Sequence, residues 1–225
     1  MTLTGSIWHL VAALAVFLAS HSLTNLKPFR ERAQRLVGKR GFYGVYSVIS
    51  IILLVWMIAA YIASPTVVVW EQQPWMRWVP ATAMLAACLL GATGLSTPNP
   101  FSIGPSGSGF DPERPGIVRL TRHPVIWALA LWAGGHAVPN GDVAALMLFV
   151  PLFGLALLGP RILDAKRRAA LGEAEWRRLA DAAARPWRTA ELLREVGAGR
   201  LVAALAVYGA LILLHQPVIG VSPLP

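Results

Sequence analysis

The residues of this sequence that are best suited to chemistry are its five histidines. Neutral imidazole ligates transition metals, including the iron of a non-covalently bound haem. The sequence has a single cysteine, Cys88, and therefore has neither an intramolecular disulfide nor a C-x-x-C-H site for covalent haem. The histidines stand at five separate positions: His9, His21, His123, His136 and His215.

Two of them, His21 and His136, have the neighbours expected of ligands inside a helix bundle. Thr24 and Asn25 follow His21 at helical spacing, so that three polar groups share one helical face. His136 follows a pair of glycines, which would let a neighbouring helix or a flat cofactor approach the backbone closely. An interhelical hydrogen bond worth about 1 kcal/mol would explain either histidine as well. We predict ligation for both, because ionisable groups within apolar helices usually serve a function.

The other three histidines stand where simpler roles suffice. His9 and His215 lie near the ends of apolar stretches, where a histidine reaches water at little cost. His123 precedes Pro124, a residue well suited to the first turn of a helix. At this position, capping and interfacial anchoring compete evenly with a binding role.

Six apolar stretches must position these histidines: residues 5–23, 42–63, 79–95, 124–138, 143–160 and 201–219. Most approach the ~20 residues that a ~30 Å hydrocarbon core requires, although the fourth offers only about 15. A composition of 56% hydrophobic and 14% charged residues, with a mean hydropathy of +0.56, excludes a soluble globular protein. The predicted fold class is all-α, a polytopic integral membrane helix bundle with about six transmembrane helices.

The basic residues predict how these spans are oriented. All 20 Lys and Arg residues except Arg77 lie in three segments, 24–41, 96–122 and 161–200. Loops rich in basic residues stay cytoplasmic, which predicts periplasmic termini and a location in a bacterial inner membrane. The net charge of +9 then suits anionic headgroups of the lipid bilayer, and nucleic acid is not an expected partner.

Two of the basic segments are predicted to have a character of their own. Residues 96–116 are rich in Pro, Gly and Ser, which predicts a flexible, irregular segment that serves as a linker or as a lid. Residues 161–184 combine Ala, Leu, Lys, Arg and Glu at helical spacing. This pattern predicts an amphipathic helix on the inner membrane face.

Several motifs taken together resemble the NnrU family of integral membrane proteins. They are Gly-Ile-Val-Arg-Leu-Thr-Arg-His-Pro at 116–124, Trp-Ala-Gly-Gly-His at 132–136, Asn-Gly-Asp at 140–142, His-Ser-Leu at 21–23 and Gly-Phe-Tyr-Gly-Val-Tyr-Ser at 41–47. The likeness covers about residues 5–165. It divides the chain into an NnrU-like transmembrane domain of five helices (1–165), a cytoplasmic amphipathic basic segment (166–200) and an additional C-terminal transmembrane helix (201–225).

The resemblance carries expectations about ligands and partners. NnrU proteins are linked to nitric oxide and denitrification metabolism, which implies nitric oxide, or respiratory and denitrification membrane proteins, as partners. Their relative zeta-carotene isomerase binds haem b through two histidines, which correspond here to His21 and His136. A cysteine near the second ligand of the isomerase corresponds to Ala133, so the resemblance implies haem binding more than redox-dependent isomerisation of an apolar substrate.

Depth in the membrane leaves a second pair of ligands open. At 1.5 Å per residue, His21 would be ~9 Å from the inner boundary, whereas His136 would be ~19 Å above His123. By depth alone His21 would pair better with His123, and this pair ranks second. Arg119 and Arg122, at the inner mouth, are predicted to pair with haem propionates.

A second resemblance concerns a different class of function. The Arg-His-Pro sequence, followed after one hairpin by a charged segment that begins near Asp164, is also similar to membrane methyltransferases of the isoprenylcysteine and phospholipid type. That likeness implies S-adenosylmethionine as an alternative cofactor on the cytoplasmic face, although Asp164 stands where those enzymes have paired glutamates. A third interpretation is a non-enzymatic assembly factor for a respiratory complex. The sequence leaves open whether the protein is an enzyme.

Overall fold

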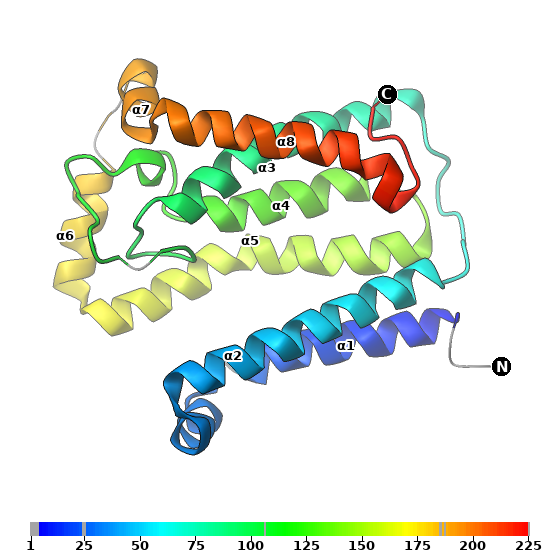
Figure 1. The fold of residues 1–225 in the computed structure, drawn as a ribbon, viewed down its shortest axis with the longest axis horizontal. Helices are drawn as coiled ribbons and strands as arrows, with labels where there is room; N and C mark the ends of the chain where they lie inside the picture. Colours follow the sequence, from blue (N-terminus) through cyan, green and yellow to red (C-terminus); the bar gives the residue numbers. More distant parts are fainter. Residues whose placement is uncertain (1–4, 24–25, 106, 185, 187, 225) are drawn as a thin grey trace. The chain divides into compact units, whose positions relative to one another are not determined.

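The computed structural model describes residues 5–23, 26–105, 107–184, 186 and 188–224, and the regular structure within them is helical (Figure 1). The predicted all-α class is confirmed. In these residues the pairing outside helices is an isolated antiparallel bridge between Val68 and Asp142. The helices are α1 (Ile7–Leu23), α2 (Lys27–Ile62), η1 (Pro74–Arg77), α3 (Trp78–Ser96), η2 (Gly116–Arg119), α4 (Pro124–Ala137), α5 (Val143–Leu171), α6 (Glu173–Ala183), α7 (Thr189–Val196) and α8 (Ala198–Ile219).

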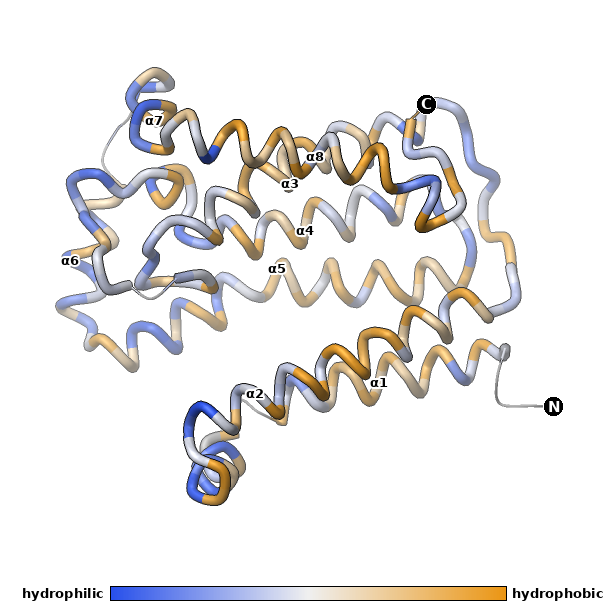
Figure 2. Tube along the Cα trace, in the orientation of Figure 1, coloured by the Kyte–Doolittle hydropathy of each residue, from blue (hydrophilic) through white to orange (hydrophobic). Residues whose placement is uncertain are grey.

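Each of the six apolar stretches coincides with a helix, and the chain is a multi-pass membrane protein. Figure 2 shows the apolar character along these helices. Four helical segments of the described chain are long and apolar enough to cross a bilayer: Pro28–Ile62, Pro74–Ser96, Val143–Leu171 and Ala198–Ile219. α1, with 17 residues, and α4, with 14, are shorter. The number of six spans and the periplasmic termini therefore stay predictions.

The chain divides into two compact units, of which the first comprises residues 1–70 and 141–148. Its described part contains α1, α2 and the first residues of α5, and α1 packs against α2. The backbone N–H of Val69 donates to the carbonyl of Gly141 (2.7 Å), and that of Val143 donates to the carbonyl of Val67 (2.9 Å). The buried apolar side chains of this unit include Leu10, Ala13, Leu14, Phe42, Met57 and Ala60.

α2 is interrupted at Gly38, whose φ of +73° lies in the left-handed region that favours glycine. Residues 27–37 therefore form a separate helical arm before the spanning part of α2. This helix was not predicted, because the basic segment 24–41 was expected to be a loop between two spans. Thr24 and Asn25, which were expected to share a face with His21, lie outside the described residues.

The second unit comprises residues 71–140 and 149–225. In it α3 packs against both α4 and α8. At Gly94 the two helices approach closely, since a Cβ atom there would lie 2.7 Å from Cγ of Pro124 and 3.0 Å from Cγ2 of Val125. This close approach positions the start of α4, and with it the neighbouring residue His123.

The substitution Gly94→Ala is expected to lower the free energy of unfolding by about 1–3 kcal/mol, because the added methyl group overpacks against Pro124. Gly209→Ala in α8 is the matched control, since nothing lies within 4 Å of a Cβ atom there. Alanine is the better helix former, so the control is expected to be neutral or stabilising. Thermal melting in detergent measures both, and equal midpoints would contradict the proposed packing.

The predicted irregular structure of residues 96–116 is confirmed between α3 and η2, but the described part of this segment is packed rather than free. Phe101 is fully buried, and Asn99 and Ser102 are almost so. The Asn99 side chain holds the segment by donating to the carbonyl of Arg122 (3.0 Å) and accepting from the N–H of Phe101 (2.9 Å). Phe101 shares an apolar cluster with Val118, Trp176, Leu179, Ala180 and Ala183. The expectation of a flexible linker is therefore wrong for the described part of this segment.

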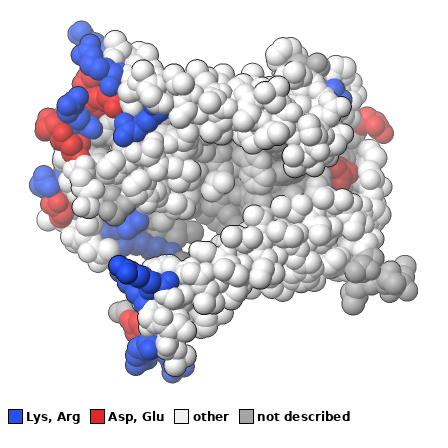
Figure 3. Space-filling model, viewed as in Figure 1, with Lys and Arg blue, Asp and Glu red and all other residues white. Residues whose placement is uncertain are grey.

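The amphipathic helix expected over 161–184 is divided between two helices. α5 continues from its apolar part to Leu171, since no residue between 161 and 171 breaks a helix. Gly172, with φ +84°, then separates it from α6. α6 turns Trp176 and Leu179 into the buried cluster and leaves its charged residues outside. Figure 3 shows Lys and Arg side chains of this unit gathered at the end that carries α6 and α7, apart from a small blue patch at the opposite end.

Candidate functional site

His136 lies near the end of α4 with its ring orientation set by two contacts. Its Nδ1–H donates to the carbonyl of Trp132, one turn earlier, at 2.8 Å. The ring stacks against Phe149 with centroids 5.5 Å apart and planes 28° apart. Because a carbonyl oxygen can only accept, this hydrogen bond places the proton on Nδ1 and the lone pair on Nε2.

The two glycines before His136 serve contacts between helices. A Cβ atom at Gly134 would lie 2.9 Å from Cε2 of Phe153 in α5. One at Gly135 would lie 3.0 Å from Cβ of Ala83 in α3. Both glycines therefore serve one of the uses expected for small residues, because side chains of α5 and α3 approach the backbone of α4 closely beside His136.

His21, at the end of α1 in the other unit, has the same local hydrogen bond. Its Nδ1–H donates to the carbonyl of Phe17, again one turn earlier and at 2.8 Å. The ring also contacts the side chains of Phe17 and Tyr46, with centroid distances of 4.3 and 5.6 Å. The proton is thus on Nδ1 and the lone pair on Nε2, as in His136.

His9 and His215 are held differently. The indole N–H of Trp56 donates to Nε2 of His9 at 2.9 Å, so the lone pair of that nitrogen is already used in a structural contact. The Nδ1–H of His215 donates to the carbonyl of Val221 (2.7 Å) in the exposed C-terminal part of the chain. The interfacial roles expected for both stay predictions, and in His9 the second ring nitrogen, Nδ1, is buried without a hydrogen-bond partner among the described residues.

His123, a further predicted site residue that directly precedes α4, belongs to a polar cluster with Arg122 and Asp164. Asp164, in α5, accepts from Nη2 of Arg122 (2.9 Å) with one oxygen and lies 3.0 Å from Nε2 of His123 with the other. The guanidinium groups of Arg122 and Arg168 lie over the ring of Trp176, at 5.2 and 3.9 Å from its centroid. The sequence did not predict that Trp176 lies beside Arg122, because α6, which carries Trp176, is brought to this cluster by the turn at Gly172.

This cluster contains buried polar atoms without hydrogen-bond partners among the described residues. They are Nε of Arg122, Nδ1 of His123 and Nε1 of Trp176. His123 is 3% exposed and Trp176 is 5% exposed. Buried polar groups are usually satisfied, so the cluster has hydrogen-bonding capacity for a water molecule or a polar ligand.

Arg119 has a separate carboxylate partner. Its guanidinium donates to both oxygens of Glu195 in α7, at 2.7 and 3.2 Å, and also to the carbonyl of Glu113 at 3.1 Å. The N–H of Gly116 adds a fourth bond, to Oε2 of Glu195, at 3.1 Å. Sequence reasoning missed Glu195, because nothing local marks a carboxylate 76 residues away as the partner of Arg119. The predicted pairing of Arg119 and Arg122 with propionates would have to compete with Glu195 and Asp164.

Lowering the pH from about 8 to about 5.5 is expected to destabilise the protein through His123. Burial lowers the pKa of His123 below its ordinary value of 6.5, and Arg122 adds to this, against the opposing effect of Asp164. As the pH falls through about 6.5, His123 binds a proton in the unfolded chain but not in the folded protein. The contribution of His123 to the free energy of unfolding is therefore present above that pH and is lost below it.

Melting temperatures at the two pH values measure this contribution. His123→Asn keeps a polar side chain beside Asp164 but does not titrate, so its melting temperature is expected to fall less than that of the unchanged protein. A fall of the same size in both proteins would show that other groups cause it.

A metal ion held only by side chains has no ready-made site in the described residues, which contain no group of three or more His, Cys, Asp or Glu placed to bind one. Axial ligation of a haem iron needs only two imidazoles. The two histidines whose Nδ1 atoms are bonded to their own helix are therefore the ligand candidates that the local geometry supports.

Comparison with known proteins gives one match. The family model described as NnrU protein matches residues 9–223 of the chain. The match includes α8, whereas the likeness noted in the sequence covered only about residues 5–165. No curated protein and no solved structure matches.

Proposed function

The chain belongs to the NnrU family, and on this premise we propose that it is a membrane haem protein in which His21 and His136 supply the axial ligands of a b-type haem. Both histidines lie on apolar helices, where lipid and neighbouring side chains exclude water. When bound, the haem would supply a redox couple and a binding site for a diatomic molecule such as nitric oxide.

The observation that supports this proposal most directly is that the two imidazoles make the same hydrogen bond. In each, Nδ1–H donates at 2.8 Å to the carbonyl four residues earlier. Such a bond fixes the ring orientation and the tautomer of a ligating histidine and raises the basicity of Nε2. The two histidines singled out by the NnrU motifs therefore share an arrangement that suits ligation through Nε2.

The remaining residues have supporting roles in this proposal. Phe149 stacks on His136, while Phe17 and Tyr46 contact His21, so both rings are held by aromatic side chains. Rigid ligands and an apolar surround are the means by which a protein sets the potential of a haem iron. We propose a role in nitric oxide or denitrification metabolism, or in redox-dependent isomerisation of an apolar substrate, at the inner membrane of a bacterium.

A spectrum of the purified protein tests the proposal. The chain is expressed with excess haem precursor, purified in detergent and examined by reduced-minus-oxidised and pyridine haemochrome spectra. Haem b bound in proportion to protein, with the narrow α and β bands of low-spin iron after reduction, is the expected result. A colourless protein that also fails to bind added haemin would overturn it.

A second candidate function rests on the cluster of Arg122, His123 and Asp164. These residues, which the methyltransferase resemblance brought together, are in contact through Asp164. The unpartnered Nε of Arg122 and Nδ1 of His123 provide hydrogen-bonding capacity. The alternative is binding of S-adenosylmethionine at this cluster. Titration calorimetry with S-adenosylmethionine separates the two candidates: binding to a colourless protein supports this one, and absence of heat removes it.

A further inference from the structure

The arm formed by residues 27–37 of α2 has an apolar stripe that is largely exposed in the described part of the chain. The stripe follows one helical face at the spacing i, i+4, i+7, i+8, from Phe29 through Ala33 to Leu36 and Val37. Phe29 is 40% exposed, Leu36 85% and Val37 52%, and Leu26 (56%) directly precedes the helix. Large apolar side chains exposed on one face of a short helix indicate a surface that meets an apolar phase.

The rest of the arm is strongly basic. Arg30, Arg32 and Arg35 lie on it, Lys39 and Arg40 follow directly, and Glu31 is the acidic residue among them. A hollow of about 440 Å³ is lined by Glu31, Gln34, Arg35 and Lys39. The hollow thus brings together cations from both sides of the break at Gly38. Positive charge beside an apolar stripe is the pattern of helices that lie in the surface of anionic membranes.

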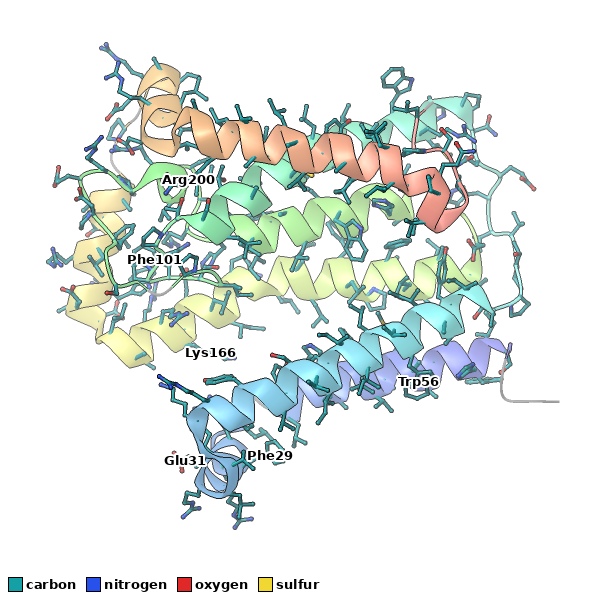
Figure 4. All side chains as sticks on the ribbon, viewed as in Figure 1. Phe29, Glu31, Trp56, Phe101, Lys166 and Arg200 are labelled. Atoms are coloured by element: carbon teal, nitrogen blue, oxygen red, sulfur yellow. The ribbon has the colours of Figure 1, made fainter. Side chains whose placement is uncertain are left out.

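The break at Gly38 gives the arm a direction of its own. Figure 1 shows the arm end-on, as a closed coil, while the spanning part of α2 and α1 beside it run across the view. The arm therefore crosses the direction of the span. In Figure 4, Phe29 and Glu31 leave the coil on different sides. A helix that crosses a span at its charged end can lie flat in the membrane surface, with one side toward lipid and the other toward water.

We propose that the arm lies in the plane of the membrane surface and binds anionic phospholipid. The apolar stripe enters the boundary between headgroups and acyl chains, and Arg35 and Lys39 receive a lipid phosphate in the hollow. Charge complementarity selects this occupant, since the basic residues favour anionic headgroups and the stripe favours lipid. The proposal concerns residues remote in sequence from His136 and does not depend on haem binding.

Nitroxide labels on the full-length protein test this arrangement. Cys88 is the one cysteine, so Cys88→Ala provides a background for labels introduced as Leu36→Cys in the stripe and Gln34→Cys in the hollow. The two proteins are reconstituted in vesicles of phosphatidylcholine with phosphatidylglycerol and in vesicles of phosphatidylcholine alone. Collision rates with oxygen, which concentrates in lipid, and with a water-soluble nickel chelate give the surroundings of each label.

With phosphatidylglycerol present, the expected result is a several-fold higher oxygen-to-nickel ratio at position 36 than at position 34. The ratio at position 36 should fall without phosphatidylglycerol, and in Arg35→Gln/Lys39→Gln it should no longer depend on that lipid. Arg177→Gln, on exposed α6, is the control and should keep the dependence. Equal access of nickel to both labels would overturn the proposal. Shielding of position 36 from both reagents would also overturn it, because a protein would then cover the stripe.

Discussion

His136→Ala is expected to abolish haem binding, with haem content reduced more than about tenfold and the Soret band lost. Loss of groups that merely orient a ligand already costs about 10–100-fold in metal affinity, and removal of the ligand itself should cost at least as much. The effect is read from pyridine haemochrome spectra of proteins expressed with excess haem precursor. His21→Ala is expected to give the same result, because each axial position needs its own imidazole.

Two controls separate ligation from damage to the fold. His215→Ala removes a half-buried imidazole that donates to Val221 and should leave the haem content unchanged. Free imidazole added to His136→Ala should restore a low-spin spectrum, since it replaces the missing ring without the backbone link. A His136→Ala protein that keeps its full haem content would exclude His136 as a ligand, and the same result with His21→Ala would exclude His21.

Glu195→Ala is expected to destabilise the basic end of the second unit by about 3–5 kcal/mol. The side chains of Arg119 and Glu195 are only 5% and 8% exposed, so the substitution removes the carboxylate that accepts two hydrogen bonds from a buried guanidinium and leaves beside it the half-exposed Glu191, at 3.7 Å. It also removes the acceptor of the Gly116 N–H. The fall in melting temperature, together with faster hydrogen exchange in η2 and α7, measures the loss.

Matched variants show whether burial of the pair is the cause. Arg177→Ala breaks the exposed pair of α6, in which the two side chains are 68% and 49% exposed, and should cost at most about 1 kcal/mol. The double variant Arg119→Met/Glu195→Leu should recover much of the lost stability, because it leaves no unpaired buried charge. If Glu195→Ala melted like Arg177→Ala, the Arg119–Glu195 pair would not hold α7 in place.

The sequence alone was enough to place the six apolar helices and to suggest the NnrU family, but it did not predict the helical arm 27–37, the extension of α5 to Leu171 or α7. A helix in a bilayer is selected by the sum of apolar residues over about 20 consecutive positions, which can be read along the chain. The histidines could also be found, since ionisable residues in apolar stretches are rare. The prediction from local composition was wrong for residues 96–116. Their Pro, Gly and Ser content predicted a free segment, whereas Phe101 within it is completely buried.

Only the tertiary structure decided the partners of the charged residues and the state of each imidazole. Arg119 meets Glu195 across 76 residues, and His123 meets Asp164 across 41. Such pairs depend on the path of the backbone through the irregular segments and the turn at Gly172. That path cannot be predicted from the residues within a short window of the sequence. The bonds of His21 and His136 lie within one helical turn, yet the rotamer that forms them depends on packing against Tyr46 and Phe149. Long-range packing therefore determines which ring nitrogen each histidine presents.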